Sequence, residues 1–190
     1  GTLPILLYGD KKQRQKYLPQ LASGNWIGCY CLTEPGAGSD ANAGKTKAVL
    51  SNEKKHYKIS GQKMWISNAA YADIFIVFAR IENDKNITAF ILDKSMDGIT
   101  LGEEEKKLGL NSSSTRQVFF NEVLVPISNL LGGRGKGFKI AMNALNVGRI
   151  KLSAAVIDAC KRAISLSIQH ANQRVQFGYP ISNYGAIQHK

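Results

Sequence analysis

Residues 30–40 read Tyr30-Cys31-Leu32-Thr33-Glu34-Pro35-Gly36-Ala37-Gly38-Ser39-Asp40, a short apolar strand that runs into a glycine-rich turn. Gly36 and Gly38 reach positive φ at little cost, so we expect the backbone to fold closely around a ligand and aim N–H groups at it. Thr33 and Ser39 add a hydroxyl near either end of the turn. Taken alone, such a stretch is more often a plain turn between strands, because glycine and proline favour turns whatever their function.

A second stretch, Gln62-Lys63-Met64-Trp65-Ile66-Ser67-Asn68, supplies an aromatic ring and a further hydroxyl. Strict alternation along a strand predicts Lys63, Trp65 and Ser67 on one face and the residues between them on the other. A tryptophan beside a serine is commonly a core aromatic. It also suits a ring packed against a flat cofactor such as an isoalloxazine, with Ser67 bonded to a ring nitrogen. Together the two stretches favour a flat, anionic cofactor.

The surrounding pattern predicts a helix, then a β-rich region, then helices. Helical spacing over Asp10–Ser23 ends at Gly24, a helix stop. Short strand-like segments follow, separated by turns at residues 52–54, 84–85 and 97–98. The expected strands are Lys45–Leu50, His56–Ser60, Lys63–Ser67, Asp73–Arg80, Ile87–Leu92 and Gln117–Val125.

Several short strands at close intervals predict an antiparallel barrel or sandwich. The absence of β-α-β alternation argues against a Rossmann fold, so Gly133–Gly137 is interpreted as a flexible helix entry and not a dinucleotide fingerprint. After Gly137 the apolar spacing predicts long buried helices.

Composition excludes several other classes. The chain has 190 residues, 44% hydrophobic and 21% charged, which is ordinary for a globular protein. Its net charge of +11 comes from scattered lysines and arginines without a nucleic-acid-binding signature, so no nucleic-acid partner is expected. No apolar run approaches the roughly 18 residues of a spanning helix, and no targeting segment is visible. The three cysteines lack metal-ligand spacing, so no metal is expected, and Cys29 and Cys31 should share one face of a strand.

The two stretches closely resemble the flavin-binding segments of the acyl-CoA dehydrogenases. Further segments fall in the same order as in that family, and several look closest to the very-long-chain type. They are residues 72–79, 106–109, 115–120, 137–139, 146–149 and 174–178. The resemblance implies an α+β fold with a central antiparallel β-barrel flanked by helical bundles. The implied domains are residues 1–25 as the end of an N-terminal helical domain, 26–130 as the barrel, and 131–190 as the start of a C-terminal helical domain.

The resemblance also implies an FAD cofactor and assigns binding residues. Those matching flavin contacts are Tyr30, Leu32, Thr33, Gly38, Ser39, Trp65, Ile66 and Ser67. Those matching contacts to the acyl-CoA substrate are Ser39, Asn146, Val147, Gly148 and Arg149. Arg174 and Gln176 match residues that reach the FAD of a neighbouring subunit, which implies a homodimer or homotetramer. For Arg174 alone, a cation at a helix C-terminus is the plain alternative.

The implied reaction is α,β-dehydrogenation of a fatty acyl-CoA to trans-2-enoyl-CoA in β-oxidation, with electrons passed to an electron-transfer flavoprotein. In one family branch the general base directly precedes the arginine that matches Arg149, but this position is Gly148. We therefore expect an internal fragment with no catalytic residue of its own and a base glutamate C-terminal to Lys190. Alternatives are an acyl-CoA oxidase, a nitroalkane oxidase or a non-catalytic flavin-binding scaffold.

The expected location is the cytoplasm in a bacterium or the mitochondrial matrix in a eukaryote. Any membrane association would depend on regions outside this sequence.

Overall fold

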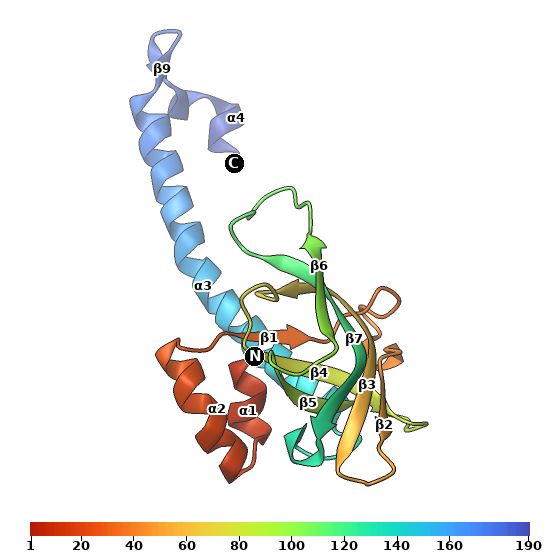
Figure 1. Cartoon of the computed structure of the whole chain (residues 1–190). Coiled ribbons are helices and arrows are strands. Elements are labelled where there is room, and N and C mark those ends of the chain that lie inside the picture. Colours follow the sequence, from red (N-terminus) through yellow and green to blue (C-terminus); the bar gives the residue numbers. More distant parts are fainter. The chain divides into compact units, whose positions relative to one another are not determined.

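The computed structural model describes residues 1–190, which divide into two units, Gly1–Ala144 and Leu145–Lys190 (Figure 1). This division does not test the expected domain boundaries, which stay predictions. The first unit is built around an eight-stranded sheet. Its strands are β1 (Gly28–Cys31), β2 (Lys47–Leu50), β3 (His56–Ser67), β4 (Ile74–Ile81), β5 (Thr88–Asp93), β6 (Ile99–Glu104), β7 (Thr115–Pro126) and β8 (Leu130–Leu131).

The class of mixed helix and sheet is as expected, but the strand arrangement differs from a purely antiparallel barrel. Hydrogen-bonded neighbours follow the open order β6-β7-β3-β2-β4-β5-β8, and β1 lies beside β4. Both β1 and β2 run parallel to β4, opposite residues 74–77 and 80–81 respectively. The two parallel pairs arise because the chain leaves the sheet after β1 and returns in the same direction as β2.

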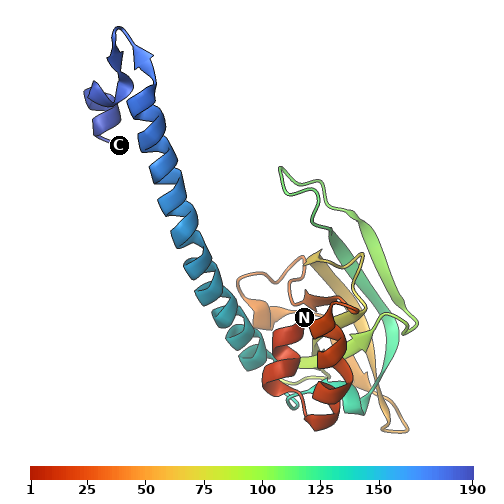
Figure 2. The ribbon, with the colours of Figure 1, turned by 90° about the vertical axis from the view of Figure 1, so that its left-hand side faces the viewer.

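Two strands differ from the prediction. Residues 56–67 form one continuous strand, β3, which pairs along its length with β7 and bends through two register shifts. Strand β6 was not predicted, because its sequence Ile-Thr-Leu-Gly-Glu-Glu offers only two apolar residues. Figure 2 shows the β6–β7 hairpin extending past the other strands of the sheet.

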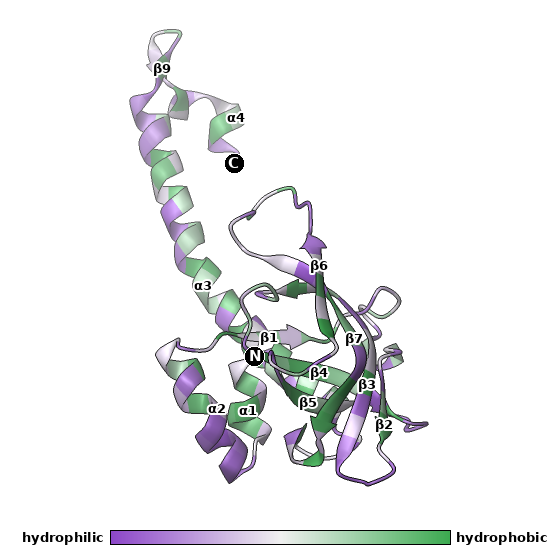
Figure 3. Ribbon diagram, in the orientation of Figure 1, coloured by the Kyte–Doolittle hydropathy of each residue, from purple (hydrophilic) through white to green (hydrophobic).

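Apolar strands form the core of the first unit. In β4 and β5 almost every residue is buried, a pattern of strands covered on both faces, and Figure 3 shows both as hydrophobic. Cys29 and Cys31 point into the core from one face of β1, as expected, with Sγ atoms 3.6 Å apart and no disulfide.

Two helices precede the sheet, α1 (Thr2–Tyr8) and α2 (Lys11–Ser23). Helix α2 begins at a capping box formed by Asp10 and Gln13 and ends at Gly24 with φ +80°, so the predicted helix is confirmed at both ends. The buried Gln13 amide donates to the carbonyls of Ser128 and Leu130, which ties α2 to β8 and to the turn before it.

Helix α3 (Gly137–Gln173) begins where the glycine-rich entry was predicted. The expectation that it is buried holds only for its first turns, because its buried residues end at Ala144. Side chains such as Ile150, Leu166 and Ile168 are exposed.

By length and composition α3 could also cross a membrane, contrary to the expectation that no segment would. Arg149 and Lys151 would each cost about 2.5–3.5 kcal/mol at the centre of a bilayer. We therefore interpret the apolar side chains of α3 as packing positions of a helical bundle.

The second unit ends in a small hairpin and a short helix. Strands β9 (Val175–Gln176) and β10 (Tyr179–Pro180) are joined by Phe177 and Gly178, whose φ values of +51° and +84° are typical of a type I′ turn. Helix α4 (Gly185–Gln188) follows. Three 3₁₀ turns complete the chain, at Ala41–Ala43, Ile127–Asn129 and Ile181–Asn183.

Candidate functional site

The two stretches that the sequence singled out lie side by side in the first unit. Residues 32–40, here called the 32–40 loop, leave β1 and cross an irregular part of β3. The N–H of Met64 donates to the carbonyl of Thr33 (2.9 Å), and the ammonium of Lys63 donates to the carbonyl of Leu32 (3.1 Å). The structure therefore brings together loop and strand, although about thirty residues separate them in the sequence.

The irregularity in β3 is a bulge, here called the 63–66 bulge. The pairing of β3 with β7 shifts register between Lys63 and Ile66, and Trp65 has φ +56°. A bulky residue in this left-handed region is strained, and such strain persists where the surrounding structure imposes it, often at ligand sites.

The bulge overturns the predicted face assignment. Lys63 is 1% exposed and does not share a face with Trp65 and Ser67, which are both exposed. The reason is that an extra residue in a strand interrupts the two-residue period of its side chains. Trp65 is 61% exposed, so its indole is available to a ligand and is not a core aromatic.

A tight turn forms the tip of the 32–40 loop. Glu34 and Ala37 exchange two backbone hydrogen bonds of 3.1 Å each across Pro35 and Gly36. The expectation of positive φ at Gly36 and Gly38 is wrong, because neither glycine adopts it. Instead, a Cβ at either position would meet no atom within 4 Å, so these glycines leave the loop surface open.

The part of the loop that follows the turn presents polar groups to its surroundings. Gly38 and Ser39 are exposed, and their N–H groups donate no hydrogen bond within the chain. Free N–H groups on adjacent residues can accept an anionic ligand such as a phosphate. The hydroxyl of Ser39 is exposed at the same place, and Thr33 is half-buried.

A buried ion pair lies under the loop, and no sequence pattern predicts it. The Lys63 ammonium is 2.7 Å from a Glu34 carboxylate oxygen, and the two side chains are 1% and 6% exposed. Glu34 also accepts hydrogen bonds from the N–H groups of Lys45 (2.5 Å) and Thr46 (3.0 Å). The pair thus joins the loop, the bulge and the segment that enters β2.

The partners set the charge states of this pair. Burial alone would raise the pKa of Glu34, but attraction to Lys63 and the hydrogen bonds outweigh it, so the pKa lies below its usual value of 4.5. Burial lowers the pKa of Lys63, and Glu34 opposes that shift. Glu34 is therefore ionised at neutral pH.

Three of the predicted flavin contacts have side chains that point away from the open loop surface. Tyr30 packs edge-on against Phe78 at 5.1 Å and donates its hydroxyl to the Ala141 carbonyl in α3 (3.2 Å), and burial raises its pKa. Leu32 and Ile66 are buried. These residues could offer a ligand their backbone, whereas Thr33, Ser39, Trp65 and Ser67 could offer side chains.

The remaining predicted residues lie in the second unit, in two groups. Asn146, Val147, Gly148 and Arg149 lie on α3, where the Arg149 guanidinium donates to the Asn146 amide oxygen (2.8 Å). Arg174 directly follows the helix, and its carbonyl accepts from the Ile181 N–H, whereas Gln176 lies in β9 and its carbonyl accepts from the Tyr184 hydroxyl. At 1.5 Å per helical residue, Arg149 and Arg174 are about 37 Å apart, so one chain does not bring the two groups together.

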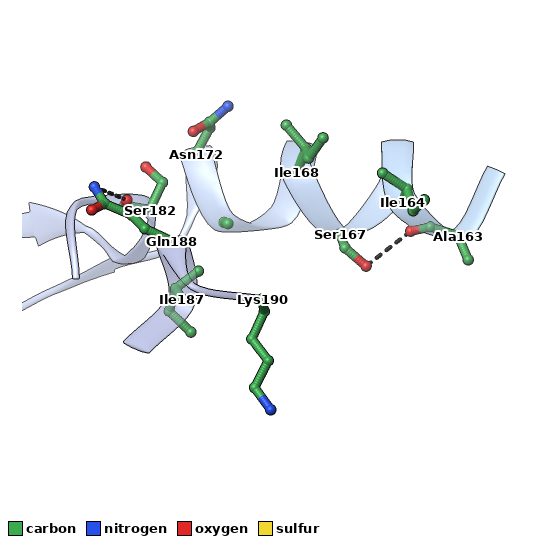
Figure 4. A pocket seen from close by; sticks show the side chains of 10 residues that line it. Ala163, Ile164, Ser167, Ile168, Asn172, Ser182, Ile187, Gln188 and Lys190 are labelled. Carbon is green, nitrogen blue, oxygen red and sulfur yellow. Dashed lines mark hydrogen bonds between the residues drawn. The ribbon is translucent and has the colours of Figure 1, made fainter. Parts of the chain in front are cut away.

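Two of the hollows in the structure bear on the predicted site residues. One of about 560 Å³ lies in the second unit between α3 and the C-terminal residues and contains none of the predicted site residues (Figure 4). Ile164 and Ile168 of α3 and Ile187 of α4 contribute to its apolar lining. The other, of about 300 Å³, lies beside Glu34, Gly36, Thr46 and Gly61 in the first unit.

Known families match most of the chain. Residues 29–123 match the family model "Acyl-CoA dehydrogenase, middle domain", and residues 135–190 match "Acyl-CoA dehydrogenase, C-terminal domain". A probable acyl-CoA dehydrogenase of Bacillus subtilis is 50% identical over all of this chain and 32% of its own length. The human mitochondrial very long-chain specific acyl-CoA dehydrogenase is 46% identical over all of this chain and 30% of its own length.

Solved structures agree. The crystal structure of an acyl-CoA dehydrogenase from Bacillus anthracis, complexed with FAD, has a TM-score of 0.92 and 49% identity, and the match covers 99% of this chain and 33% of that one. The butyryl-CoA dehydrogenase of Megasphaera elsdenii has a TM-score of 0.89 and 40% identity over 98% of this chain and 49% of that one. The chain thus spans about a third to a half of the proteins that it matches.

Proposed function

Because the chain belongs to the acyl-CoA dehydrogenase family, we propose that it is part of an FAD-dependent enzyme that removes two hydrogens from an acyl-CoA thioester. The observation that carries the proposal is the junction of the 32–40 loop with the 63–66 bulge. There an exposed, strained tryptophan lies on a bulge that is hydrogen-bonded to a loop with free N–H groups. This combination offers a flat surface for a ring system and donors for phosphates.

The residues present fit FAD in chemistry as well as in position. The indole of Trp65 and the hydroxyls of Thr33 and Ser67 would hold the isoalloxazine. The Gly38 and Ser39 N–H groups would hold anionic oxygens. When bound, FAD supplies a hydride acceptor for the β-hydrogen of the substrate. The chain's own part is to bind and orient the ring.

The exposed hydroxyl of Ser39 would also contact the acyl-CoA, and Asn146–Arg149 would contact its coenzyme A side. Arg149 is already oriented by its hydrogen bond to Asn146. Arg174 and Gln176 would reach the FAD of a second copy, which predicts a homodimer or homotetramer. This assignment is supported by their distance along α3 from the substrate residues, because a single chain could not readily use both groups at one site.

The general base would come from outside residues 1–190. Removal of the α-proton requires a positioned carboxylate, and such a base typically contributes a factor on the order of 10²–10⁴ in rate. Position 148, which precedes Arg149, is glycine and cannot act as one. The Glu34 carboxylate is buried and accepts hydrogen bonds from Lys45, Thr46 and Lys63, so it is not a candidate.

The finer function that we propose is fatty acid β-oxidation with a long acyl chain, with electrons passed to an electron-transfer flavoprotein. The support is the identity to very long-chain specific enzymes. The compartment would be the cytoplasm in a bacterium or the mitochondrial matrix in a eukaryote.

The test is anaerobic titration of the full-length protein with acyl-CoAs of increasing chain length, following the flavin absorbance band. Bleaching by a saturated acyl-CoA is expected, and the most effective chain length identifies the substrate. Rapid reoxidation of the reduced flavin by oxygen would favour an oxidase instead. A yellow protein that no acyl-CoA bleaches would contradict dehydrogenation, and failure to bind FAD would contradict the cofactor assignment.

A further inference from the structure

We propose that the buried Lys63–Glu34 ion pair is a positioning device, which holds the 32–40 loop and the 63–66 bulge in their flavin-binding arrangement before FAD is present. This inference rests on the proposed function for the identity of the ligand. It assigns a role to two side chains that point away from the open surface of the site and would not themselves contact FAD.

The pair connects three segments that are separate in the sequence. Lys63 donates to the Leu32 carbonyl at the start of the loop and to the Glu34 carboxylate two residues later. Glu34 in turn accepts from the N–H groups of Lys45 and Thr46, which lie just before β2. Both ends of the excursion between β1 and β2 are therefore fixed to one buried charge pair.

The same pair sets where the flavin-facing groups lie. The neighbour of Lys63, Met64, donates its N–H to the carbonyl of Thr33, and Trp65 follows in the bulge. If Lys63 were released, both the Leu32 carbonyl and the Glu34 carboxylate would lose a donor while still buried. The loop would then have to rearrange, and Thr33 and Trp65 would no longer be held in fixed positions relative to each other.

Stability alone is a poor explanation for such a pair. Replacing both members of a buried ion pair by neutral side chains of similar volume is often neutral or stabilising, whereas removing one member leaves an uncompensated charge. If the pair positions the loop, removing both charges should restore stability but leave FAD binding weak. If the pair only stabilises the fold, both stability and FAD binding should recover.

The experiment compares full-length variants Lys63→Met, Glu34→Gln and the double variant with wild type. A matched control is Lys58→Met with Glu122→Gln, because Lys58 also lies in β3 but its ion pair with Glu122 of β7 is exposed (46% and 67%, N–O distance 3.4 Å). Three quantities are measured: the Tm of the apoprotein, the Kd for FAD from flavin fluorescence, and hydrogen exchange of the amides in residues 32–40.

We expect each single variant to lower Tm and to weaken FAD binding. In the double variant we expect Tm to recover by at least half, while FAD binding stays weaker by about tenfold or more, because an unfixed loop must be ordered on binding. Amide exchange in the loop should stay faster than in wild type. The control pair should change none of the three.

Recovery of both Tm and FAD affinity in the double variant would overturn the proposal, since the pair would then serve stability alone. If wild type itself binds no FAD, the proposed function fails, and hydrogen exchange still decides the positioning role. Faster exchange in the double variant but not in the control would then support it, and unchanged exchange would overturn it.

Discussion

Gly61 is a position in the first unit where we expect a single added methyl group to be disruptive. It lies in β3 between its two register shifts, with φ +153°. A Cβ built on it would lie 2.6 Å from the Thr46 hydroxyl oxygen and 2.7 Å from the Thr46 Cα. A rotamer change can move the hydroxyl but not the Cα, so Gly61→Ala must push β3 and the segment before β2 apart.

The expected loss can be estimated from two contributions. Overpacking in a well-packed region costs about 1–3 kcal/mol, and an alanine in a sparsely populated backbone conformation costs a further 1–3 kcal/mol or so. We therefore expect Gly61→Ala to lower the free energy of unfolding by about 2–6 kcal/mol. With a urea m-value of about 2 kcal/mol/M, the midpoint falls by about 1–3 M.

Urea unfolding followed by far-UV circular dichroism measures this change, and Gly36→Ala is the matched control. Gly36 has neither positive φ nor an atom within 4 Å of the added Cβ. Its replacement should leave stability unchanged or raise it by up to about 1 kcal/mol, because alanine restricts the unfolded chain. A loss below about 0.5 kcal/mol for Gly61→Ala, or an equal loss for both variants, would refute the reasoning.

Three further results are expected. Phe177→Asn should raise Tm by a few degrees, since asparagine tolerates the left-handed φ of +51° better than phenylalanine; no increase would mean that the exposed ring has a packing partner. Glu104→Gln should speed proteolysis within residues 105–114, because the Glu104 carboxylate bonds to the far end of that loop and its pKa is lowered to about 2. The wild-type loop should keep its resistance until the pH falls close to that value. Glu34→Gln should be less stable than wild type at neutral pH, with the difference disappearing in acid. The folded-state pKa of Glu34 lies below 4.5, so its stabilising effect is present above pH 4.5 and is lost as the pH falls through the folded value; a constant difference in acid denaturation curves would contradict this.

Sequence patterns pointed to the loop and the strand that the structure brings together, but not to their geometry. The strand before the loop, the helix ending at Gly24 and the helix beginning at Gly137 follow from apolar periodicity and from glycine positions, and all are found in the structure. Local signals of this kind depend on neighbouring residues only, which is why they can be read from one sequence.

The errors come from interactions between distant segments. Alternation placed Lys63 with Trp65, because a β-bulge depends on the partner strand and leaves no mark in the sequence of β3 itself. The ion pair with Glu34 was missed for a related reason, since a strand lysine normally faces solvent. The parallel pairing of β1 and β2 with β4 likewise needs the three-dimensional path of the chain.

The parallel pairs on β4 have a consequence for how this site can change. Strands β1 and β2 occupy consecutive positions along one edge of β4, ending opposite Val77 and starting opposite Arg80, so they act as two halves of one interrupted strand. The gap between the halves is about 10 Å at 3.3 Å per residue, far less than the fifteen or so residues of the excursion could span. Residues 32–46 thus form an insertion between two segments that together occupy one strand position beside β4. If Glu34 is kept as the partner of the buried Lys63, the length and other contents of this insertion can change without altering the order of any strand.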